Sequence, residues 1–216
     1  MSNEKGKIFA AWKPKGPTSA EFLNRLKKKI GARKVGHAGT LDPLASGILV
    51  VGVGRAATKR LNMAVGEEKE YFVKIKLGMR STTGDEEGKK EVVEREHFPG
   101  IEHIEKVLRS FIGMVDQVPP AYSALKIKGT PAYKLARRGK TPEMNPRRVK
   151  IFSIGIISYD PPYLELKVVT GPGVYIRSLA RDIGDALGVG GYVADLTRTR
   201  VGKYTREDGT DIVGIW

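Results

Sequence analysis

Alternation of apolar and polar residues predicts strands in several parts of the chain. The clearest stretch is 69–77, in which four apolar side chains alternate with polar ones: Tyr71, Val73, Ile75 and Leu77. This two-residue period is typical of a half-buried strand. Similar patterns bounded by turn residues predict strands at 8–12, 48–53, 149–159, 164–170, 192–197 and 201–204.

Apolar residues that recur every three or four positions predict helices. Thr18 with Glu21 three residues later forms a capping box. An apolar stripe follows it, made of Phe22, Leu23, Leu26 and Ile30. Further helices are predicted at 56–63, 101–112, 131–138 and 175–187. Because helices and strands alternate irregularly and hairpins recur, we expect an α+β fold with a mixed, mostly antiparallel sheet flanked by helices.

A segment rich in glycine, Lys34 to Leu49, contains the most distinctive polar residues. Gly36 and Gly39 allow backbone angles that are closed to other residues, which predicts a shaped loop rather than a helix or a strand. Pro43 stiffens the backbone and pushes Asp42 toward extended geometry. A carboxylate held in this way can act as a nucleophile or a general base. The simpler alternative is a turn in which Asp42 accepts hydrogen bonds from nearby backbone amides.

Composition and charge narrow the class of protein. The 216 residues suit one domain, and the absence of cysteine excludes disulfides and thiolate metal sites. The formal net charge of +14 favours a polyanionic partner, most simply nucleic acid, over a generic basic surface. Nine basic residues and one acidic residue lie between Lys126 and Lys150, as a surface that follows phosphates would require. Because no signal peptide or membrane span is visible, we expect a soluble, cytoplasmic protein. We also expect it to be a monomer.

Six motifs occur in a fixed order and cover nearly the whole chain. They are Lys13–Ser19, Gly36–Gly47, Lys69–Tyr71, Gln117–Lys126, Gly173–Leu179 and Leu196–Gly202. In this set and order, the chain resembles the TruB family of tRNA pseudouridine synthases. Six motifs in order are a far more specific signal than one short pattern.

The resemblance implies a fold and a reaction. The fold would be the pseudouridine synthase fold, with a central active-site cleft. The reaction would be the isomerisation of uridine to pseudouridine at position 55, in the T loop of tRNA, without a cofactor or a metal. We expect residues 1–216 to form a single catalytic domain, with a small inserted subdomain at about 80–150, and no C-terminal RNA-binding PUA domain.

The resemblance also assigns roles to residues. Asp42 matches the catalytic aspartate, and Arg177 would be the cation that holds it ionised and in place. Tyr71 would stack against the target base, and His37 would fill the gap left by the flipped uridine. Further contacts to substrate are expected from Tyr175, Leu196 and Lys59. Candidates for contacts to the RNA backbone are Lys15, Lys34, Arg137, Arg138, Arg147 and Arg148.

Several alternatives stay open from the sequence. The aspartate can attack the base, attack the sugar, or start elimination as a base. Arg177 alone fits a surface arginine in the first turn of a helix, and Tyr71 and Leu196 alone fit ordinary core positions. A tRNA-folding chaperone, or the catalytic subunit of an RNA-guided pseudouridine synthase, would share the same basic surface. Metal ligation by His37 is disfavoured, since His97 and His103 lie in an unrelated acidic region.

Overall fold

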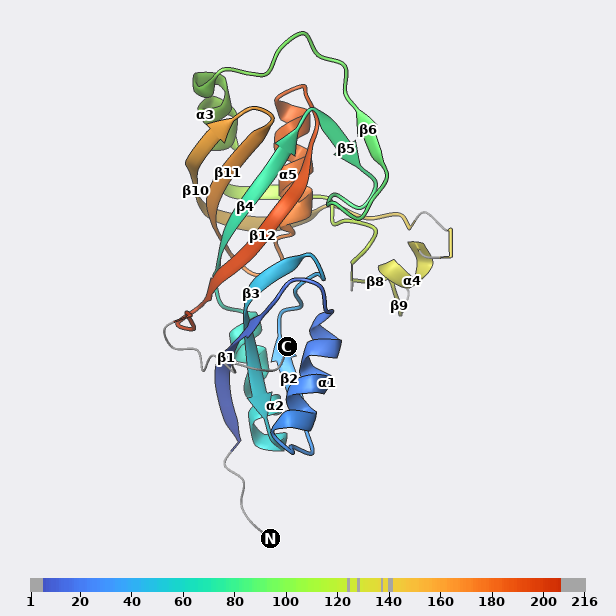
Figure 1. Ribbon diagram of the computed structural model, residues 1–216, viewed down its shortest axis with the longest axis vertical. Coiled ribbons are helices and arrows are strands. Elements are labelled where there is room, and N and C mark those ends of the chain that lie inside the picture. Colours follow the sequence, from blue (N-terminus) through green and yellow to red (C-terminus); the bar gives the residue numbers. More distant parts are fainter. Residues whose placement is uncertain (1–5, 124, 128, 137, 140–141, 207–216) are drawn as a thin grey trace. The chain divides into compact units, whose positions relative to one another are not determined.

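The computed structural model describes residues 6–123, 125–127, 129–136, 138–139 and 142–206 (Figure 1). The chain divides into two compact units. Unit 1 comprises Met1–Phe72, Val169–Pro172 and Asp195–Trp216, and unit 2 comprises Val73–Val168 and Gly173–Ala194.

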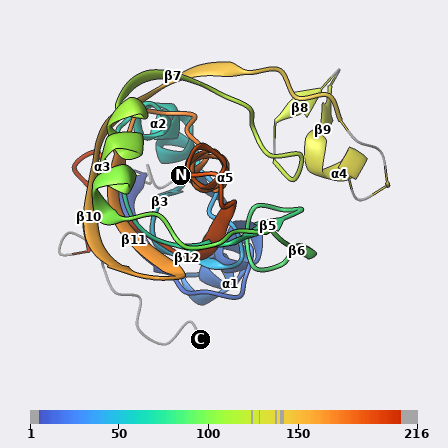
Figure 2. The ribbon, with the colours of Figure 1, turned by 90° about the horizontal axis from the view of Figure 1, so that it is seen from above.

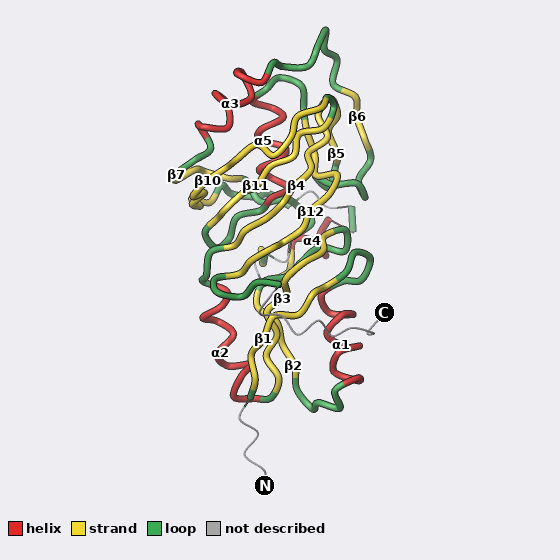
Figure 3. Tube along the Cα trace, turned by 60° about the vertical axis from the view of Figure 1, so that its left-hand side comes forward, coloured by secondary structure: helices red, strands yellow, loops and turns green. Residues whose placement is uncertain are grey.

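One eight-stranded sheet carries most of the strands (Figure 3). Its order is β1-β3-β12-β4-β11-β10-β7, with β2 also paired to β3. The pairs β1–β3, β2–β3 and β7–β10 are antiparallel, whereas β12 runs parallel to β3. The predicted α+β fold with a mixed sheet flanked by helices is therefore confirmed. These strands are β1 (Lys7–Lys13), β2 (Val35–Ala38), β3 (Ala45–Val53), β4 (Lys69–Leu77), β7 (Gly113–Gln117), β10 (Arg147–Asp160), β11 (Tyr163–Thr170) and β12 (Gly191–Val201).

In unit 1, strand β3 is covered on both of its faces. Helix α1 (Ser19–Lys29) begins with the predicted capping box and packs Phe22 and Leu26 against Leu49 and Val51. Helix α2 (Arg55–Val65) contributes to a second cluster, which contains alternate residues of β3, among them Ile48. A strand that is buried on both faces needs a continuous apolar run, which explains the sequence from 48 to 53.

Unit 2 is built around helix α5 (Ile176–Ala186), which Figure 2 shows end-on within the curve of β10 and β11. The predicted alternation of β4 is confirmed, because Val73, Ile75 and Leu77 are buried. Gly184 of α5 approaches β12 so closely that an added Cβ would lie 2.2 Å from the nitrogen of Gly191. The remaining elements are β5 (Met79–Ser81), β6 (Lys90–Val92), α3 (Ile101–Ser110), β8 (Lys126–Ile127), β9 (Thr130–Pro131) and α4 (Ala132–Ala136).

The loop predicted at 34–49 is partly wrong, because its two ends are strands. Val35–Ala38 is β2, and β3 already begins at Ala45. Gly36 pairs in register with Gly52 and lies against Leu61 of α2, so it serves close packing rather than an unusual backbone angle. Only Gly39 fulfils the expectation, with φ of +75°.

The separate strands predicted at 192–197 and 201–204 are also corrected. Strand β12 runs unbroken from Gly191 to Val201, and Val201 then forms only an isolated bridge to Tyr204. The prediction left Arg198 between the two strands. It remains in the sheet because Arg198 is buried and Arg200 is paired with Glu68.

Candidate active site

The loop from Gly39 to Leu44 presents Asp42 between two strands of unit 1. Its backbone is bonded at several points. The amide of Ala45 donates to the carbonyl of Asp42 at 3.1 Å, and the amide of Gly16 donates to the carbonyl of Pro43 at 2.8 Å. Asp42 itself is half-buried. The carboxylate is thus carried on a short backbone segment that is tied to its surroundings on both sides.

Ser19, at the start of α1, fixes the residue before Asp42. Its buried hydroxyl donates to the carbonyl of Leu41 at 2.8 Å and accepts from the amide of Leu41 at 2.9 Å. The side chain of Ser19 therefore binds both the backbone amide and the backbone carbonyl of Leu41. Because α1 is anchored by its capping box and apolar face, it gives the loop a rigid support.

Two buried cations hold the ends of the same loop. Lys13 donates to the carbonyls of Pro14 at 2.9 Å and Ala45 at 2.8 Å, and more weakly to Pro43 at 3.5 Å. Arg198 donates through Nη2 to the carbonyl of Gly39 at 2.9 Å and through Nε to Ile48 at 2.8 Å. Their exposed fractions are only 0% and 1%.

Sequence reasoning did not single out Lys13 or Arg198. Each lies just beyond the end of a predicted strand but within one of the six motifs, Lys13–Ser19 or Leu196–Gly202, and that was the available signal. Buried basic residues are rare unless their donors are used. Here the donors are used by backbone carbonyls of the loop that presents Asp42.

The electrostatics around the loop are strongly positive. Burial lowers the pKa of Lys13 to about 8, the charge of Asp42 opposes this shift, and Arg198 adds to it. Burial, followed by repulsion from Arg198, likewise lowers the pKa of Lys69 to about 8. Asp42 is the acid whose charge favours the protonated form of Lys13. Positive charge close to a carboxylate favours its ionised form.

His37 lies on β2, directly opposite Val51 of β3. Burial first, and then the charge of Arg198, lowers its pKa below the usual value, so the imidazole is neutral near pH 7. Its Nδ1 atom is buried and has no hydrogen-bond partner among the described residues. A neutral, flat ring suits stacking against bases, and its insertion into RNA stays a prediction.

Tyr71 and Leu196 are both buried, as core residues would be, with exposed fractions of 6% each. Leu196 stands beside Ala45 in the parallel pairing of β12 with β3, so it lies close to the end of the Asp42 loop. Tyr71 lies on the buried face of β4. Their contacts to substrate stay predictions.

In unit 2, Arg177 is the second residue of α5 and is almost fully buried. Its guanidinium donates to the carbonyls of Thr83 at 3.0 Å and Tyr122 at 2.8 Å. It also pairs with the carboxylate of Asp85 at 3.4 Å. A cation near a helix N-terminus is unfavourable unless it is compensated, and Asp85 supplies that compensation.

Sequence reasoning did not single out Asp85. The signal that pointed to it was the unexplained arginine at the helix start. The predicted pairing of Asp42 with Arg177 joins residues of different units and stays a prediction. Tyr175 caps α5, and its amide donates to Gln117 Oε1 at 2.8 Å.

The predicted contacts to the RNA backbone occupy exposed positions where the structure describes them. Lys15 is exposed but forms an ion pair with Asp195 at 2.6 Å. Arg137 lies outside the described residues. The other candidates are exposed: Lys34, Arg138, Arg147 and Arg148. Lys59, which is expected to contact substrate, is exposed as well.

The described part of the chain has neither a cluster of metal ligands nor a membrane-spanning helix. Among those residues, no three His, Asp or Glu side chains gather as a metal site would need. Within the same residues, no helix has the length and apolar character needed to cross a membrane.

Comparison with known proteins identifies relatives over most of the chain. The profile of the TruB family pseudouridylate synthase N-terminal domain matches residues 27–176. That of the tRNA pseudouridylate synthase B C-terminal domain matches residues 177–213. The tRNA pseudouridine synthase B of Thermotoga petrophila is 46% identical over 95% of this chain and 66% of its own length. That of Mycobacterium sp. (strain KMS) is 46% identical over 92% of this chain and 68% of its own length.

A solved structure shares the fold. The crystal structure of a Cbf5-Nop10-Gar1 complex contains a chain that is 30% identical, with a TM-score of 0.71 over 92% of this chain and 50% of that one. The chain thus spans about two thirds of the Thermotoga relative and half of the structural neighbour.

Proposed function

Because the chain belongs to the TruB family of pseudouridine synthases, we propose that it converts uridine to pseudouridine in tRNA, at position 55 of the T loop. The observation that carries this proposal is Asp42 on a loop whose backbone is held by Ser19, Lys13 and Arg198. The 46% identity to proteins named tRNA pseudouridine synthase B supports tRNA as the substrate. The 30% identity to a chain of the Cbf5-Nop10-Gar1 complex gives weaker support to the alternative, a catalytic subunit of a larger assembly.

The proposed reaction needs no cofactor, because the substrate and the product contain the same atoms and electrons. The bond between N1 of uracil and C1′ of ribose breaks, the base turns, and C5 bonds to C1′. C5 loses its proton, and N1 ends with one, so that the product is an isomer of the substrate. Asp42 is the group that starts this sequence, and Arg177 maintains its charge and orientation. Tyr71 packs against the base.

Access to the uridine requires that it leave the folded loop of the RNA. Flipping costs a few kcal/mol, which contacts to the opened RNA must offset. We assign His37 to the space left behind, and Tyr175 and Leu196 to the flipped nucleotide. The exposed basic residues, with Lys59 among them, would bind phosphates by charge rather than by sequence.

The test is tritium release from a T-arm stem-loop that carries 5-tritiated uridine. Because release follows loss of the C5 hydrogen, it reports the isomerisation directly. Asp42→Asn should lower the rate at least about 1,000-fold. RNA affinity should stay within a few-fold, since the amide retains the shape of the side chain.

Asp116→Asn is the matched control, because Asp116 is exposed and the chemical change is the same. Full activity of Asp42→Asn would overturn the proposal. If neither wild type nor variant released tritium while both bound RNA tightly, a folding chaperone would become the better description.

Salt dependence tests the binding of phosphates separately. With roughly four phosphate contacts, affinity for the stem-loop should fall about 100-fold between 50 and 200 mM salt. Arg148→Gln should reduce the slope of log affinity against log salt by about one. A flat response in fluorescence anisotropy would contradict the role of the basic surface.

A further inference from the structure

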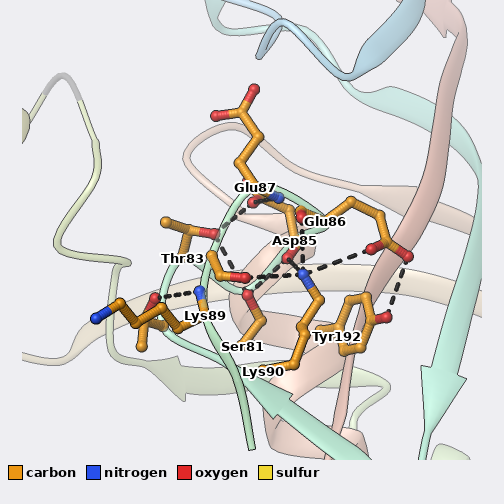
Figure 4. A network of polar contacts seen from close by, with 10 residues as sticks. Ser81, Thr83, Asp85, Glu86, Glu87, Lys89, Lys90 and Tyr192 are labelled. Atoms are coloured by element: carbon orange, nitrogen blue, oxygen red, sulfur yellow. Dashed lines mark hydrogen bonds and ion pairs between the residues drawn. The ribbon is translucent and has the colours of Figure 1, made fainter.

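Lys90, the first residue of β6, gathers three backbone carbonyls around one ammonium group (Figure 4). Its Nζ atom donates to the carbonyls of Asp85 at 3.1 Å, Glu86 at 2.7 Å and Gly88 at 2.9 Å. Carbonyl oxygens that point to one spot repel each other, and a cation at the centre offsets this repulsion. The lysine supplies that cation from within the protein.

Two further groups surround the same ammonium. The Glu86 carboxylate lies 3.4 Å from Nζ, and the ring of Tyr192 lies beneath it at 4.7 Å from the ring centroid. The Tyr192 hydroxyl donates to the Glu86 carboxylate at 3.1 Å. Burial, and then this hydrogen bond, raises the pKa of Tyr192 to about 12, so the phenol remains a donor.

The loop that Lys90 closes is the one that presents Asp85. The Ser81 hydroxyl donates to the Asp85 carbonyl at 2.6 Å, and the Glu87 amide donates to Asp85 Oδ1 at 3.0 Å. The Thr83 hydroxyl donates to the same oxygen. The other carboxylate oxygen, Oδ2, faces Arg177. The amide of Glu87 and the carbonyls that bind Lys90 belong to the same short loop, so the position of Lys90 and the position of Asp85 depend on one backbone conformation (Figure 4).

We infer that Lys90 is a positioning residue for the reaction: its ammonium, held by Glu86 and Tyr192, shapes the loop through which Asp85 orients Arg177. The inference rests on the proposed function, because it needs Arg177 to act in catalysis. Lys90 touches no reacting atom. Its effect is expected on the rate of the chemical step rather than on RNA affinity.

The first experiment compares Lys90→Met with Lys89→Met in tritium release. Both variants lose one positive charge from neighbouring positions, but the Lys89 side chain is exposed. Lys90→Met should lower kcat about 10- to 100-fold with KM changed less than about threefold, because small displacements of catalytic groups have effects of this size. Lys89→Met should leave kcat unchanged. Equal kcat values for the two variants would overturn the inference.

A double-mutant cycle tests whether Lys90 acts through Asp85. If it does, Lys90→Met combined with Asp85→Asn should be no slower than Asp85→Asn alone. Effects on kcat that multiply would instead show an independent role for Lys90 and overturn the inference.

Two more conservative variants test the inference if Lys90→Met does not fold. Glu86→Gln removes the carboxylate that holds both Lys90 and Tyr192, whereas Glu91→Gln makes the same change at another exposed position. Glu86→Gln should lower kcat about 2- to 5-fold with an unchanged KM, and the control should not. Release by wild type with no difference between these variants would overturn only the positioning role. No release by wild type would overturn the proposed function, and the inference with it.

Discussion

Two loops of this protein, one in each unit, contain an aspartate and a lysine whose ammonium binds several backbone carbonyls. In unit 1, the ammonium of Lys13 binds the carbonyl of Pro14 and, just after Asp42, those of Pro43 and Ala45. In unit 2, Lys90 binds the carbonyls of Asp85, Glu86 and Gly88. In both loops a lysine ammonium thus brings several backbone carbonyl oxygens together around one positive charge.

The two lysines differ in what balances their charge. Lys90 has Glu86 and the ring of Tyr192 beside it, and its side chain is 21% exposed. Lys13 is completely buried, and the nearby charges that shift its pKa are those of Asp42 and Arg198. The charge of Lys90 is thus balanced by Glu86 within its own loop. The acid whose charge acts on Lys13 is Asp42, so the charges of Lys13 and Arg198 favour the ionised form of its carboxylate.

The two aspartates also differ in how they are bound. Asp85 is fully used by Arg177, Thr83 and the amide of Glu87, so it is a structural anchor. Asp42 is half-buried on a backbone that is itself immobilised by other residues. Asp42, the proposed reacting group, thus has a loop backbone that is bound by other residues, and Asp85, which we propose orients Arg177, is bound through its side chain.

The largest effect should come from breaking the unit 2 loop at Arg177. Arg177→Met leaves the carboxylate of Asp85 buried without its cation, and it frees the carbonyls of Thr83 and Tyr122. We expect the free energy of unfolding to fall by about 3–5 kcal/mol, measured by urea denaturation. Isomerisation should be lost as well.

Arg181→Met is the control for this experiment. Arg181 lies one turn further along α5, and its pair with Asp182 is partly exposed. We expect that variant to lose less than about 1 kcal/mol. Equal urea midpoints for the two variants would show that the buried pair does not stabilise unit 2.

A somewhat smaller effect is expected from Ser19→Ala in unit 1. The variant leaves both the amide and the carbonyl of Leu41 without their partner in a buried place. The free energy of unfolding should fall by about 2–4 kcal/mol. Because Leu41 precedes Asp42, kcat should also fall, while RNA affinity stays unchanged.

Ser110→Ala, at the exposed end of α3, is the matched control for Ser19→Ala. It should change neither stability nor kcat appreciably. A Ser19→Ala enzyme with wild-type kcat would indicate that Asp42 is held without help from α1.

The smallest expected effect is on the pH dependence of stability, and it tests whether Lys13 is buried as a cation. Lys13 has a pKa of about 8 in the folded protein and about 10.5 when unfolded. Between these values the unfolded chain binds more protons, so the stability should rise with pH in this range. Lys13→Met should flatten the rise by roughly 1–3 kcal/mol in urea denaturation from pH 7 to pH 10.5. An unchanged slope would mean that Lys13 is not buried as a cation.

Much of the fold could be predicted because it depends on local patterns. The capping box of Thr18 and Glu21, the alternation of β4 and the apolar stripe of α5 each reflect the environment of single elements. The wrong predictions concern segments whose structure depends on the strand or side chain with which they pair. Gly36 lies in a strand because Gly52 pairs with it, and Arg198 stays within β12 because carbonyls of unit 1 bind it.

The sequence by itself determined the elements, the positive charge and the order of motifs that leads to Asp42. Those properties follow from side-chain periodicity and composition, which are local. Only the tertiary structure decided that Lys13, Ser19 and Arg198 converge on one loop, and that Asp85 compensates Arg177. These contacts join residues up to 159 positions apart, and burial makes them strong because water no longer competes for the donors.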